Sequence, residues 1–236
     1  ENTIKEIKEE NNIYILNLKE EYEQKLSDIN NNIIVHKKVI FENGEIYEGD
    51  WKNGIREGKG IYYYNDGCKY KGDWKNDKQE GKGTYYYKHG DKYEGDWKNG
   101  IREGKGIKYY KNGDRYEGDY KNGKREGKGK YYYNDGDRYV GEWKNNLKEG
   151  KGVCYYKDGY IYNGDYKNDK REGKGVFYYK NGDRYEGDYK NDKRDGKGIY
   201  YYRNGDREMG DYSKDKPKGK HVILSYTGKV TSEFYN

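Results

Sequence analysis

Residues that could bind a metal or act as nucleophiles are few in this chain of 236 residues, and they are scattered. The three histidines, His36, His89 and His221, do not cluster, so their spacing does not indicate a zinc site. Cys68 and Cys154 would lie roughly 35 Å apart in the sheet argued for below, whereas a disulfide needs Cα atoms within about 7 Å. We therefore expect free thiols, no metal and no cofactor. Reduced thiols and the lack of a secretory segment are typical of a cytoplasmic protein.

Two short segments resemble ligand-binding motifs but fail their requirements. Residues 54–60 read Gly-Ile-Arg-Glu-Gly-Lys-Gly, which is close to a phosphate-binding P-loop. However, three residues separate the two glycines where four are needed, and Gly60 stands where a Ser or Thr would bind magnesium. Residues 135–137 read Asp-Gly-Asp but lack the further oxygen ligands that an EF-hand places at fixed offsets. Both segments are therefore interpreted as turns.

The remaining candidates for chemistry, the acids and the Tyr hydroxyls, recur with a period of 23 residues. Counting positions from Tyr47, every unit has Gly at position 3, an aromatic residue at position 5, Gly-Lys-Gly at positions 12–14 and Gly at position 21. An active site is not copied seven times, so we predict that the protein is not an enzyme. After the first unit, the repeats begin at Tyr70, Tyr93, Tyr116, Tyr139, Tyr162 and Tyr185.

The composition limits the kind of fold that such a repeat can build. Charged residues make up 39% of the chain and the apolar set 31%, while Gly occurs 35 times and Tyr 34 times. Leu, Ile and Val are thus too scarce for an ordinary globular core, and the many aromatic residues argue against disorder. No apolar run approaches the roughly 18 residues of a membrane span. An ordered repeat protein is the class that remains.

Each repeat predicts a β-hairpin. Residues 47–51 and 58–64 alternate side-chain types with the period of two that a strand requires. We expect residues 52–57 to form a polar loop between these strands, and residues 65–67 to turn the chain toward the next hairpin. The predicted fold is an all-β repeat: one elongated antiparallel β-meander of about eight 23-residue hairpins, preceded by one N-terminal amphipathic α-helix.

Alternation along the strands predicts two different faces of the sheet. Positions 1, 3, 5, 12, 14, 16 and 18 share one face, where aromatic rings lie across bare glycine backbone. Positions 2, 4, 13, 15 and 17 form the other face, where we expect cross-strand ion pairs such as Asp50–Lys59 and Asp96–Lys105. The Tyr at position 17 either packs across the strands or forms a second contact surface.

These residues resemble the MORN repeat family (membrane occupation and recognition nexus), whose pattern is Tyr-x-Gly-x-Trp, Gly-x-Gly and an Asp-Gly turn. The resemblance covers about residues 39–228, with a half-repeat cap at 38–46, seven repeats at 47–207, and a decayed eighth repeat with a C-terminal cap at 208–236. In the eighth repeat, Glu208 replaces the Tyr of position 1 and His221 replaces the Gly of position 14. The constant Tyr at position 17 departs from the family pattern, in which a small polar residue is frequent.

The first 37 residues lack the repeat and predict an amphipathic helix. This segment has a net charge of −3, against +9 for the remaining 199 residues. Since an isolated apolar stripe needs a partner, we expect the helix to dock on the repeats, in cis or in trans, or to pair with another chain as a homodimer. Its apolar residues are spaced too irregularly for a long coiled coil and are Ile4, Ile7, Tyr14, Leu18, Tyr22, Leu26, Ile29 and Ile33.

The aromatic face is the first candidate binding surface. It is long and shallow, and its rings are stiff with polar tips, which suits an interface. A sheet that curls around this face would hold an amphipathic helix of a protein partner. The candidate contact residues occupy positions 1 and 5 and are Tyr47, Trp51, Tyr70, Trp74, Tyr93, Trp97, Tyr116, Tyr120, Tyr139, Trp143, Tyr162, Tyr166, Tyr185 and Tyr189.

The second candidate surface is basic. Lys and Arg at positions 9 and 10 of the predicted loops would form a row that meets anionic lipids such as phosphoinositides, although an acid at position 11 offsets part of this charge. A net charge of +6 is too small to favour nucleic acid. The candidate lipid-binding residues are Arg56, Arg102, Lys124, Arg125, Lys148, Lys170, Arg171, Lys193 and Arg194.

The resemblance to MORN proteins implies a scaffold at cortical membranes, junctions, cilia or cytoskeletal structures, often as an elongated dimer. Together with the residues, it favours a non-enzymatic scaffold that binds protein partners. The alternatives are a peripheral membrane module for anionic lipids and the regulatory repeat region of a larger enzyme such as a phosphoinositide kinase. The expected location is cytoplasmic, either membrane-associated or cytoskeletal.

Overall fold

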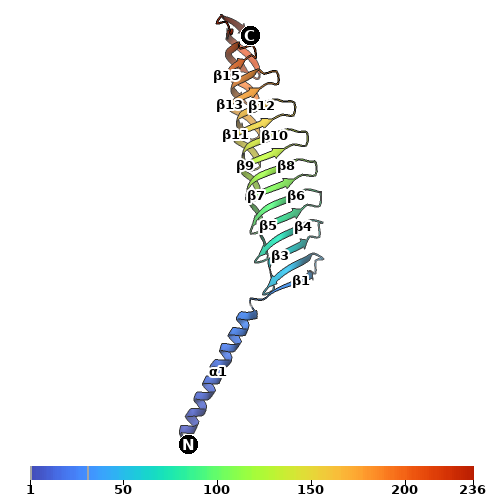
Figure 1. The fold of residues 1–236 in the computed structure, drawn as a ribbon, viewed down its shortest axis with the longest axis vertical. Helices are drawn as coiled ribbons and strands as arrows, with labels where there is room; N and C mark the ends of the chain where they lie inside the picture. Colours follow the sequence, from blue (N-terminus) through green and yellow to red (C-terminus); the bar gives the residue numbers. More distant parts are fainter. Residues whose placement is uncertain (1, 31) are drawn as a thin grey trace.

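The chain forms one helix followed by one long sheet (Figure 1). The structure is a computed structural model that describes residues 2–30 and 32–236. Within these residues, helix α1 (Asn2–Asn30) is followed by an antiparallel sheet of 18 strands. Each strand pairs with the strand that follows it in the chain, as β1 does with β2 and β17 with β18. The predicted fold, an elongated β-meander preceded by one helix, is confirmed.

Eight hairpins make up most of the sheet, and one further strand lies at each end. At the two ends are β1 (Ile34–Ile40) and β18 (Val230–Tyr235). The first strands of the hairpins are β2 (Ile46–Lys52), β4 (Lys69–Lys75), β6 (Lys92–Lys98), β8 (Arg115–Lys121), β10 (Arg138–Lys144), β12 (Ile161–Lys167), β14 (Arg184–Lys190) and β16 (Arg207–Ser213). The second strands are β3 (Ile55–Tyr63), β5 (Lys78–Tyr86), β7 (Ile101–Tyr109), β9 (Lys124–Tyr132), β11 (Leu147–Tyr155), β13 (Lys170–Tyr178), β15 (Lys193–Tyr201) and β17 (Lys216–Leu224).

The connection inside each hairpin is much shorter than predicted. In the first hairpin only Asn53 and Gly54 separate the two strands, and both have positive φ, 52° and 78°. Such a pair is the signature of a tight type I′ turn, whose twist matches that of the flanking strands. The prediction of a polar loop over 52–57 was therefore wrong, because residues 55–57 already belong to β3. The second predicted turn is confirmed, with Gly67 at a φ of 87°.

A β-bulge in each hairpin supplies the residues that the predicted loop was thought to hold. Gly49 pairs with Gly60, but two residues along β2, Trp51 already pairs with Arg56. Between these pairs Asp50 alone faces residues 57–59, and its Oδ2 atom accepts a hydrogen bond from the backbone N–H of Lys59 at 2.9 Å. The bulge thus places Arg56 in the strand, on the same face as Trp51.

The bulge also changes the predicted ion pairs. Lys59 and Lys105 contact the carboxylates of Asp50 and Asp96 through their backbone N–H groups. Their ammonium groups reach instead across to the next hairpin, where Lys59 pairs with Asp73 and Lys105 with Asp119. The prediction of pairs within one hairpin was wrong, and the pairs instead join consecutive hairpins.

The N-terminal boundary also lies elsewhere than predicted. The helix was expected over 1–37, but α1 ends at Asn30 and β1 begins at Ile34, so the predicted cap at 38–46 lies within a fully paired strand and the turn after it. The β-branched residues 33–35 favour a strand over a helix at this place. Ile33, expected on the helical stripe, lies outside the helix.

The apolar stripe of α1 does not dock on the sheet in this structure. Figure 1 shows the helix extending away from the β1 end of the sheet. The exposed fractions of Tyr14, Leu18 and Tyr22 are 63%, 47% and 67%. Ile4 and Ile7 lie outside the residues whose side chains are described. The stripe therefore stays available for a partner.

Candidate partner-binding faces

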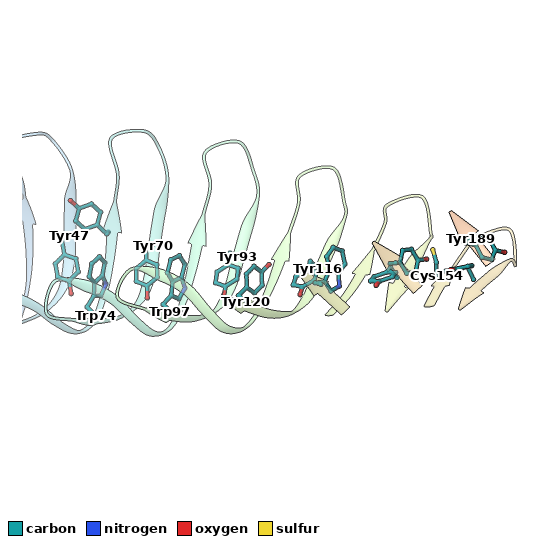
Figure 2. Packing of buried hydrophobic residues seen from close by; sticks show 14 of the residues in the cluster. Tyr47, Tyr70, Trp74, Tyr93, Trp97, Tyr116, Tyr120, Cys154 and Tyr189 are labelled. Atoms are coloured by element: carbon teal, nitrogen blue, oxygen red, sulfur yellow. The ribbon is translucent and has the colours of Figure 1, made fainter. Parts of the chain in front are cut away.

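A ladder of buried rings runs along the aromatic face (Figure 2). Tyr47 lies edge-on between the ring of Trp51, at 5.2 Å between centroids, and the ring of Trp74 from the next hairpin, at 5.3 Å. Its hydroxyl donates a hydrogen bond to the backbone oxygen of Asp50 at 3.1 Å. The ring fits because a Cβ atom at Gly60 would occupy the same space. The predicted role of Gly as a floor for the rings is therefore confirmed at this pair.

The predicted contact residues on this face are almost fully buried. At position 1 the side chains have no exposed surface, with an exposed fraction of 0% from Tyr47 to Tyr185. At position 5 the exposed fraction runs from 4% to 8%. These residues therefore support the face, and a partner would touch the half-buried rings at positions 16 and 18. Those rings include Tyr64, Tyr85, Tyr87, Tyr110, Tyr131, Tyr133, Tyr156, Phe177, Tyr179 and Tyr200.

Burial also keeps the tyrosine hydroxyls of the ladder protonated, and so unreactive, at neutral pH. Desolvation raises the pKa of Tyr47 to about 12, and it raises the pKa of Tyr70 and Tyr116 as well. A phenol with a raised pKa stays protonated and donates a hydrogen bond, as each of these three does to a backbone oxygen. The hydroxyls thus hold the bulge in place and are poor nucleophiles.

The cation at position 10 covers the ladder instead of projecting from a loop. The guanidinium carbon of Arg125 lies 4.3 Å from the ring centroid of Trp143 and 5.3 Å from that of Tyr131. The same group donates a hydrogen bond to the backbone oxygen of Asn146 in the next turn. The prediction that these cations lie in loops was wrong, because the turn takes only two residues. The residues concerned are Arg56, Arg102, Arg125, Lys148, Arg171 and Arg194.

The position 9 residues of the same predicted set behave differently. Lys124, Lys170 and Lys193 are exposed at the start of their strands, beside the tight turns. Each faces another lysine across the turn, as Lys121 faces Lys124. Like charges directly opposite each other destabilise a sheet slightly. These lysines are therefore the part of the predicted basic row that stays open to a ligand.

A groove runs along the opposite face, and the sequence analysis did not identify it. Three hollows of about 690, 760 and 910 Å³ adjoin one another from β2 to β16. The first two share Lys82, Glu94 and Gly95 in their walls, and the second and third share Lys151. We call this continuous hollow the lysine groove, because the Lys residues of position 13 line it throughout.

The residues on the floor of the lysine groove differ from repeat to repeat. This floor is formed by positions 2 and 15, which lie opposite each other in the register, as Glu94 and Ile107 do. Toward β2 this row is mostly charged, and toward β16 it is mostly apolar. In spatial order it reads Glu48, Ile61, Lys71, Thr84, Glu94, Ile107, Glu117, Lys130, Val140, Val153, Asn163, Val176, Glu186, Ile199 and Met209.

The Tyr file at position 17 packs against cations of the neighbouring strand. Arg184 lies with its guanidinium carbon 4.0 Å from the ring centroid of Tyr201, and Arg138 lies 4.3 Å from that of Tyr155. Of the two interpretations offered by the sequence, these contacts favour cross-strand packing. The rings still keep part of their surface, since Tyr178 is 41% exposed.

The eighth hairpin replaces the ladder Tyr by a buried contact between His221 and Glu208. His221 is fully buried, and its Nδ1 atom lies 2.8 Å from Oε1 of Glu208. Its Nε2 atom lies 2.8 Å from the backbone oxygen of Asp211. The imidazole ring occupies the space above Gly210 that a Cβ atom would need. Tyr202 donates a further hydrogen bond to Oε2 of Glu208 at 2.6 Å.

The part of the chain that the structure describes holds no candidate metal centre. Among the side chains that the structure describes, those of residues 14–30 and 32–236, no group of three or more His, Cys, Asp or Glu is placed to hold a metal ion. Cys68 and Cys154 are buried and free, on different hairpins. No helix among these residues is long and apolar enough to cross a bilayer.

The comparisons with known proteins agree with this architecture. The MORN repeat model matches seven consecutive segments, at residues 47–69, 70–92, 93–115, 116–138, 139–159, 162–184 and 185–207. The chain belongs to the MORN repeat family. These MORN repeats coincide with the seven ladder hairpins and leave out the eighth, in which the Tyr of position 1 is missing.

Among solved structures, the chain is similar to the wild-type TCP10 domain of Danio rerio CPAP, with a TM-score of 0.52 and 13% identity over 84% of this chain and 94% of that one. It is also similar to the SAS-4 (dCPAP) TCP domain of Drosophila melanogaster, solved in complex with a proline-rich motif of Ana2 (dSTIL), with a TM-score of 0.44 and 15% identity over 75% of this chain and 90% of that one. The first likeness concerns the fold alone. No curated protein matches this chain.

Proposed function

We propose that this MORN-repeat chain is a non-enzymatic scaffold that binds a protein segment in the lysine groove, at a cortical, ciliary or cytoskeletal structure of the cytoplasm. The observation that carries the proposal is the non-repeating floor of this groove. Positions that build the sheet recur in every unit, whereas Glu94, Val140 and Asn163 occupy the same floor position, position 2, with different chemistry. Residues that the fold does not constrain are free to recognise a partner.

The groove suits an amphipathic helix. An α-helix rises about 1.5 Å per residue, so a helix of about 20 residues laid along the groove covers roughly three hairpins when strands lie about 4.8 Å apart. Laid along the groove, its apolar face would meet Val140 and Val176, while charged residues further along would meet Glu94 and Lys130. The helix comes from another protein or, in trans, from α1 of a second copy.

Capture experiments with matched variants test this proposal. We expect Val140→Asp and Val176→Asp, which place charge on the groove floor, to reduce capture of specific partners from a cell extract at least tenfold. Tyr133→Asp, on the aromatic face, is the control and leaves those partners bound. Quantitative mass spectrometry measures the capture, and circular dichroism establishes that each variant is folded.

Two outcomes decide between the faces. Loss of the same partners in Tyr133→Asp alone would move the binding site to the aromatic face that the sequence analysis favoured. Equal capture by wild type and by all three folded variants would reject protein binding on either face of the sheet.

A second candidate function, binding to anionic lipids, is favoured by the lysine pairs beside the tight turns. Across three of these turns the facing pairs are Lys121 and Lys124, Lys167 and Lys170, and Lys190 and Lys193. Each lysine near an anionic surface contributes about 1 kcal/mol. The remaining alternative, a regulatory repeat region of a larger enzyme such as a phosphoinositide kinase, stays a prediction.

Vesicle flotation tests the lipid proposal. Vesicles with phosphoinositide should retain the wild type at physiological salt and lose the triple variant Lys124→Glu, Lys170→Glu, Lys193→Glu. A matched variant with three groove lysines changed to Glu, Lys128, Lys151 and Lys174, carries the same charge and should still bind. No binding of the wild type would reject this candidate.

A further inference from the structure

One face of α1 carries a narrow stripe of exposed apolar side chains. Among the helix residues whose side chains are described, five of them follow one another at intervals of three or four residues, so they lie on one face. Their exposed fractions run from 40% to 67%. We call this face the α1 stripe, and its members are Ile15, Leu18, Tyr22, Leu26 and Ile29. Large apolar side chains exposed in one line indicate an interface.

The length of the α1 stripe fits the spacing of the hairpins. Ile15, Tyr22 and Ile29 are seven residues apart, which is about 10.5 Å along a helix that rises 1.5 Å per residue. One hairpin adds two strands, or about 9.6 Å, to the length of the lysine groove. Laid along this groove, the helix would present one of these three side chains to each of three consecutive hairpins.

The distribution of apolar and charged residues gives the direction of the helix. Residues 14–18 carry no charge, whereas acids and lysines follow from Lys19 onward. The floor of the groove is mostly apolar toward β16 and mostly charged toward β2. Ile15 therefore matches the floor at Val176, and the charged part of the helix points toward β2.

The net charges of the helix and of the groove are opposite. Residues 14–30 contain four acids and two lysines, a net charge of −2. The second and third hollows together are lined by seven Lys and five acids, a net charge of +2. The two surfaces therefore attract each other, in addition to the contact between their apolar residues.

In this direction an acid of the helix falls beside a lysine of the groove. Asp28 lies 13 residues beyond Ile15, about 20 Å along the helix. Lys128 on β9 lies four strands from Val176 on β13, about 19 Å along the groove. Within the described residues the ammonium group of Lys128 makes no ion pair, whereas that of Lys151 pairs with Asp165 of the next hairpin. Lys128 is therefore available to Asp28.

The helix of the same copy does not reach this part of the groove. Ile15 precedes Asn30 by 15 residues, about 22 Å of helix, and the connection from Asn30 to Ile34 adds at most about 14 Å. Val140 lies on β10, nine strands from β1, or about 43 Å away, and Val176 lies further still. Figure 1 shows α1 pointing away from the sheet. The α1 stripe therefore reaches the apolar part of the floor only in another copy.

We propose that α1 of one copy of this chain binds in the lysine groove of a second copy. The α1 stripe packs on the floor between Val140 and Val176, with Asp28 beside Lys128. This inference rests on the proposed function, because it names the helix that the groove binds. The contact joins two different surfaces, a helix and a groove. Because a helix from a second copy fills the groove, self-association and the binding of a foreign partner exclude each other.

Mixing two variants that fail for different reasons tests the contact. Leu18→Asp places charge on the α1 stripe and leaves the groove intact, whereas the double variant Val140→Asp, Val176→Asp leaves the helix intact. We expect sedimentation velocity to show the wild type at multiples of 28.1 kDa and each variant to associate at least tenfold more weakly. The mixture should associate, because the intact helix of the groove variant enters the intact groove of the helix variant.

Pairing of two α1 helices with each other gives a different pattern. That contact would use the same surface on both copies, so the groove variant would still form dimers and mixing would rescue nothing. This pattern, or a wild type that stays at the monomer mass at every concentration, would overturn the proposal.

Failure of this inference differs from failure of the proposed function. A monomeric wild type whose capture of partners from an extract is lost in the groove variant would assign the groove to a foreign helix and reject the second copy. Capture that is unchanged in the groove variant would reject the proposed function itself. If the inference holds, Leu18→Asp should capture more of those partners than the wild type does, since its groove stays empty.

Charge reversal tests the position of the helix in the groove. Asp28→Lys and Lys128→Glu, each alone, should weaken self-association about fivefold, and mixing them should restore it. A base near the end of a helix favours its dipole, so Asp28→Lys does not weaken α1 itself. Failure of the mixture to exceed the single variants would count against the proposal.

A matched control separates this effect from a change in net charge. Glu20 lies on the side of α1 that is opposite to the stripe, so Glu20→Lys changes the charge by the same amount outside the contact. It should leave self-association within about twofold of the wild type, and circular dichroism establishes that every variant is folded. Equal losses in Glu20→Lys and Asp28→Lys would reject the placement of the helix.

Discussion

The seven ladder hairpins and the eighth hairpin solve the same packing problem with different strands. In a ladder hairpin, Tyr47 of the first strand covers Gly60 of the second. In the eighth, the ring of His221 on the second strand covers Gly210 on the first. The hydrogen bond is kept as well, since the Tyr hydroxyl and the His Nε2 atom both reach the backbone oxygen of position 4. The fold therefore requires one ring over one glycine, supplied by either strand.

The exchange changes the electrostatics of the site. The phenol of Tyr47 is neutral, whereas His221 lies against the carboxylate of Glu208. A backbone oxygen only accepts hydrogen bonds, so Nε2 of His221 carries a proton, and Nδ1 shares one with Glu208. The ladder hairpins are thus held by Tyr rings, and the eighth hairpin is held by a buried hydrogen bond between His221 and Glu208, so the loss of one partner leaves the other buried and unsatisfied.

The largest expected effect is the loss of the stability of the ladder hairpins at alkaline pH. The fold raises the pKa of Tyr47 from 10.0 to about 12, so the unfolded chain loses its protons first as the pH rises. The stability that the phenols contribute is present below pH 10 and is lost toward pH 12. We expect phenolate absorbance and circular dichroism to change together above pH 10, as the ladder unfolds. Phenolate formation by the ladder near pH 10 with an unchanged sheet would contradict this.

Adding one methyl group tests the ring-over-glycine contact. A Cβ atom at Gly129 would overlap the ring of Tyr116, so Gly129→Ala should lower the free energy of unfolding by about 3 kcal/mol. The control is Gly219→Ala in the eighth hairpin, where nothing lies within 4 Å and only the positive φ of 71° is unfavourable. It should cost about 1 kcal/mol, and equal costs in thermal unfolding would show that the ladder contact is unimportant.

Removing the imidazole of His221 should affect the eighth hairpin and leave the ladder hairpins unchanged. His221→Ala leaves Glu208 buried without this hydrogen-bond partner and removes the ring over Gly210, which should destabilise the eighth hairpin by about 3 kcal/mol. Because each strand contacts only its neighbours, hydrogen exchange should accelerate in β16–β18 and stay unchanged in β8 and β9. The double variant Glu208→Tyr, His221→Gly restores the ladder residues and should recover the protection. Slow exchange in His221→Ala would mean that the pair is dispensable.

An exposed ion pair provides the smallest expected effect. Lys174 and Asp188 join two ladder hairpins at 2.5 Å, but the lysine side chain is 72% exposed, against 0% for that of His221. Lys174→Ala should therefore change the free energy of unfolding by about 0.5 kcal/mol or less in a denaturant titration. A loss as large as that of His221→Ala would show that burial is not what distinguishes the two pairs.

The repeat made most of the fold predictable. The 23-residue period placed the strands, and the alternation of Tyr47, Gly49 and Trp51 predicted the buried face. The hairpin turn was missed although Asn53-Gly54 is a strong signal for a two-residue turn. Because of that single error, Arg56 was predicted to lie in a loop, although it lies over the ladder. The other cations of position 10 were misplaced for the same reason.

Other features depend on relations between strands that no local pattern contains. The lysine groove is formed by strands from successive repeats, and its signal was the absence of a period at positions 2 and 15. In the sequence, His221 and Glu208 are each visible as a departure from the repeat. That the two replacements compensate each other becomes clear only when the two strands are aligned.

The pairing of each strand with its sequence neighbours has a mechanical consequence. A sheet pulled along its length from its two ends would open at one edge and release its hairpins one after another, because no strand is pinned by a distant part of the chain. Each event frees 23 residues, or about 80 Å of extended chain at roughly 3.5 Å per residue. Under tension the protein would lengthen in nearly equal steps, and it would act as an extensible tether whose stride is the length of its repeat.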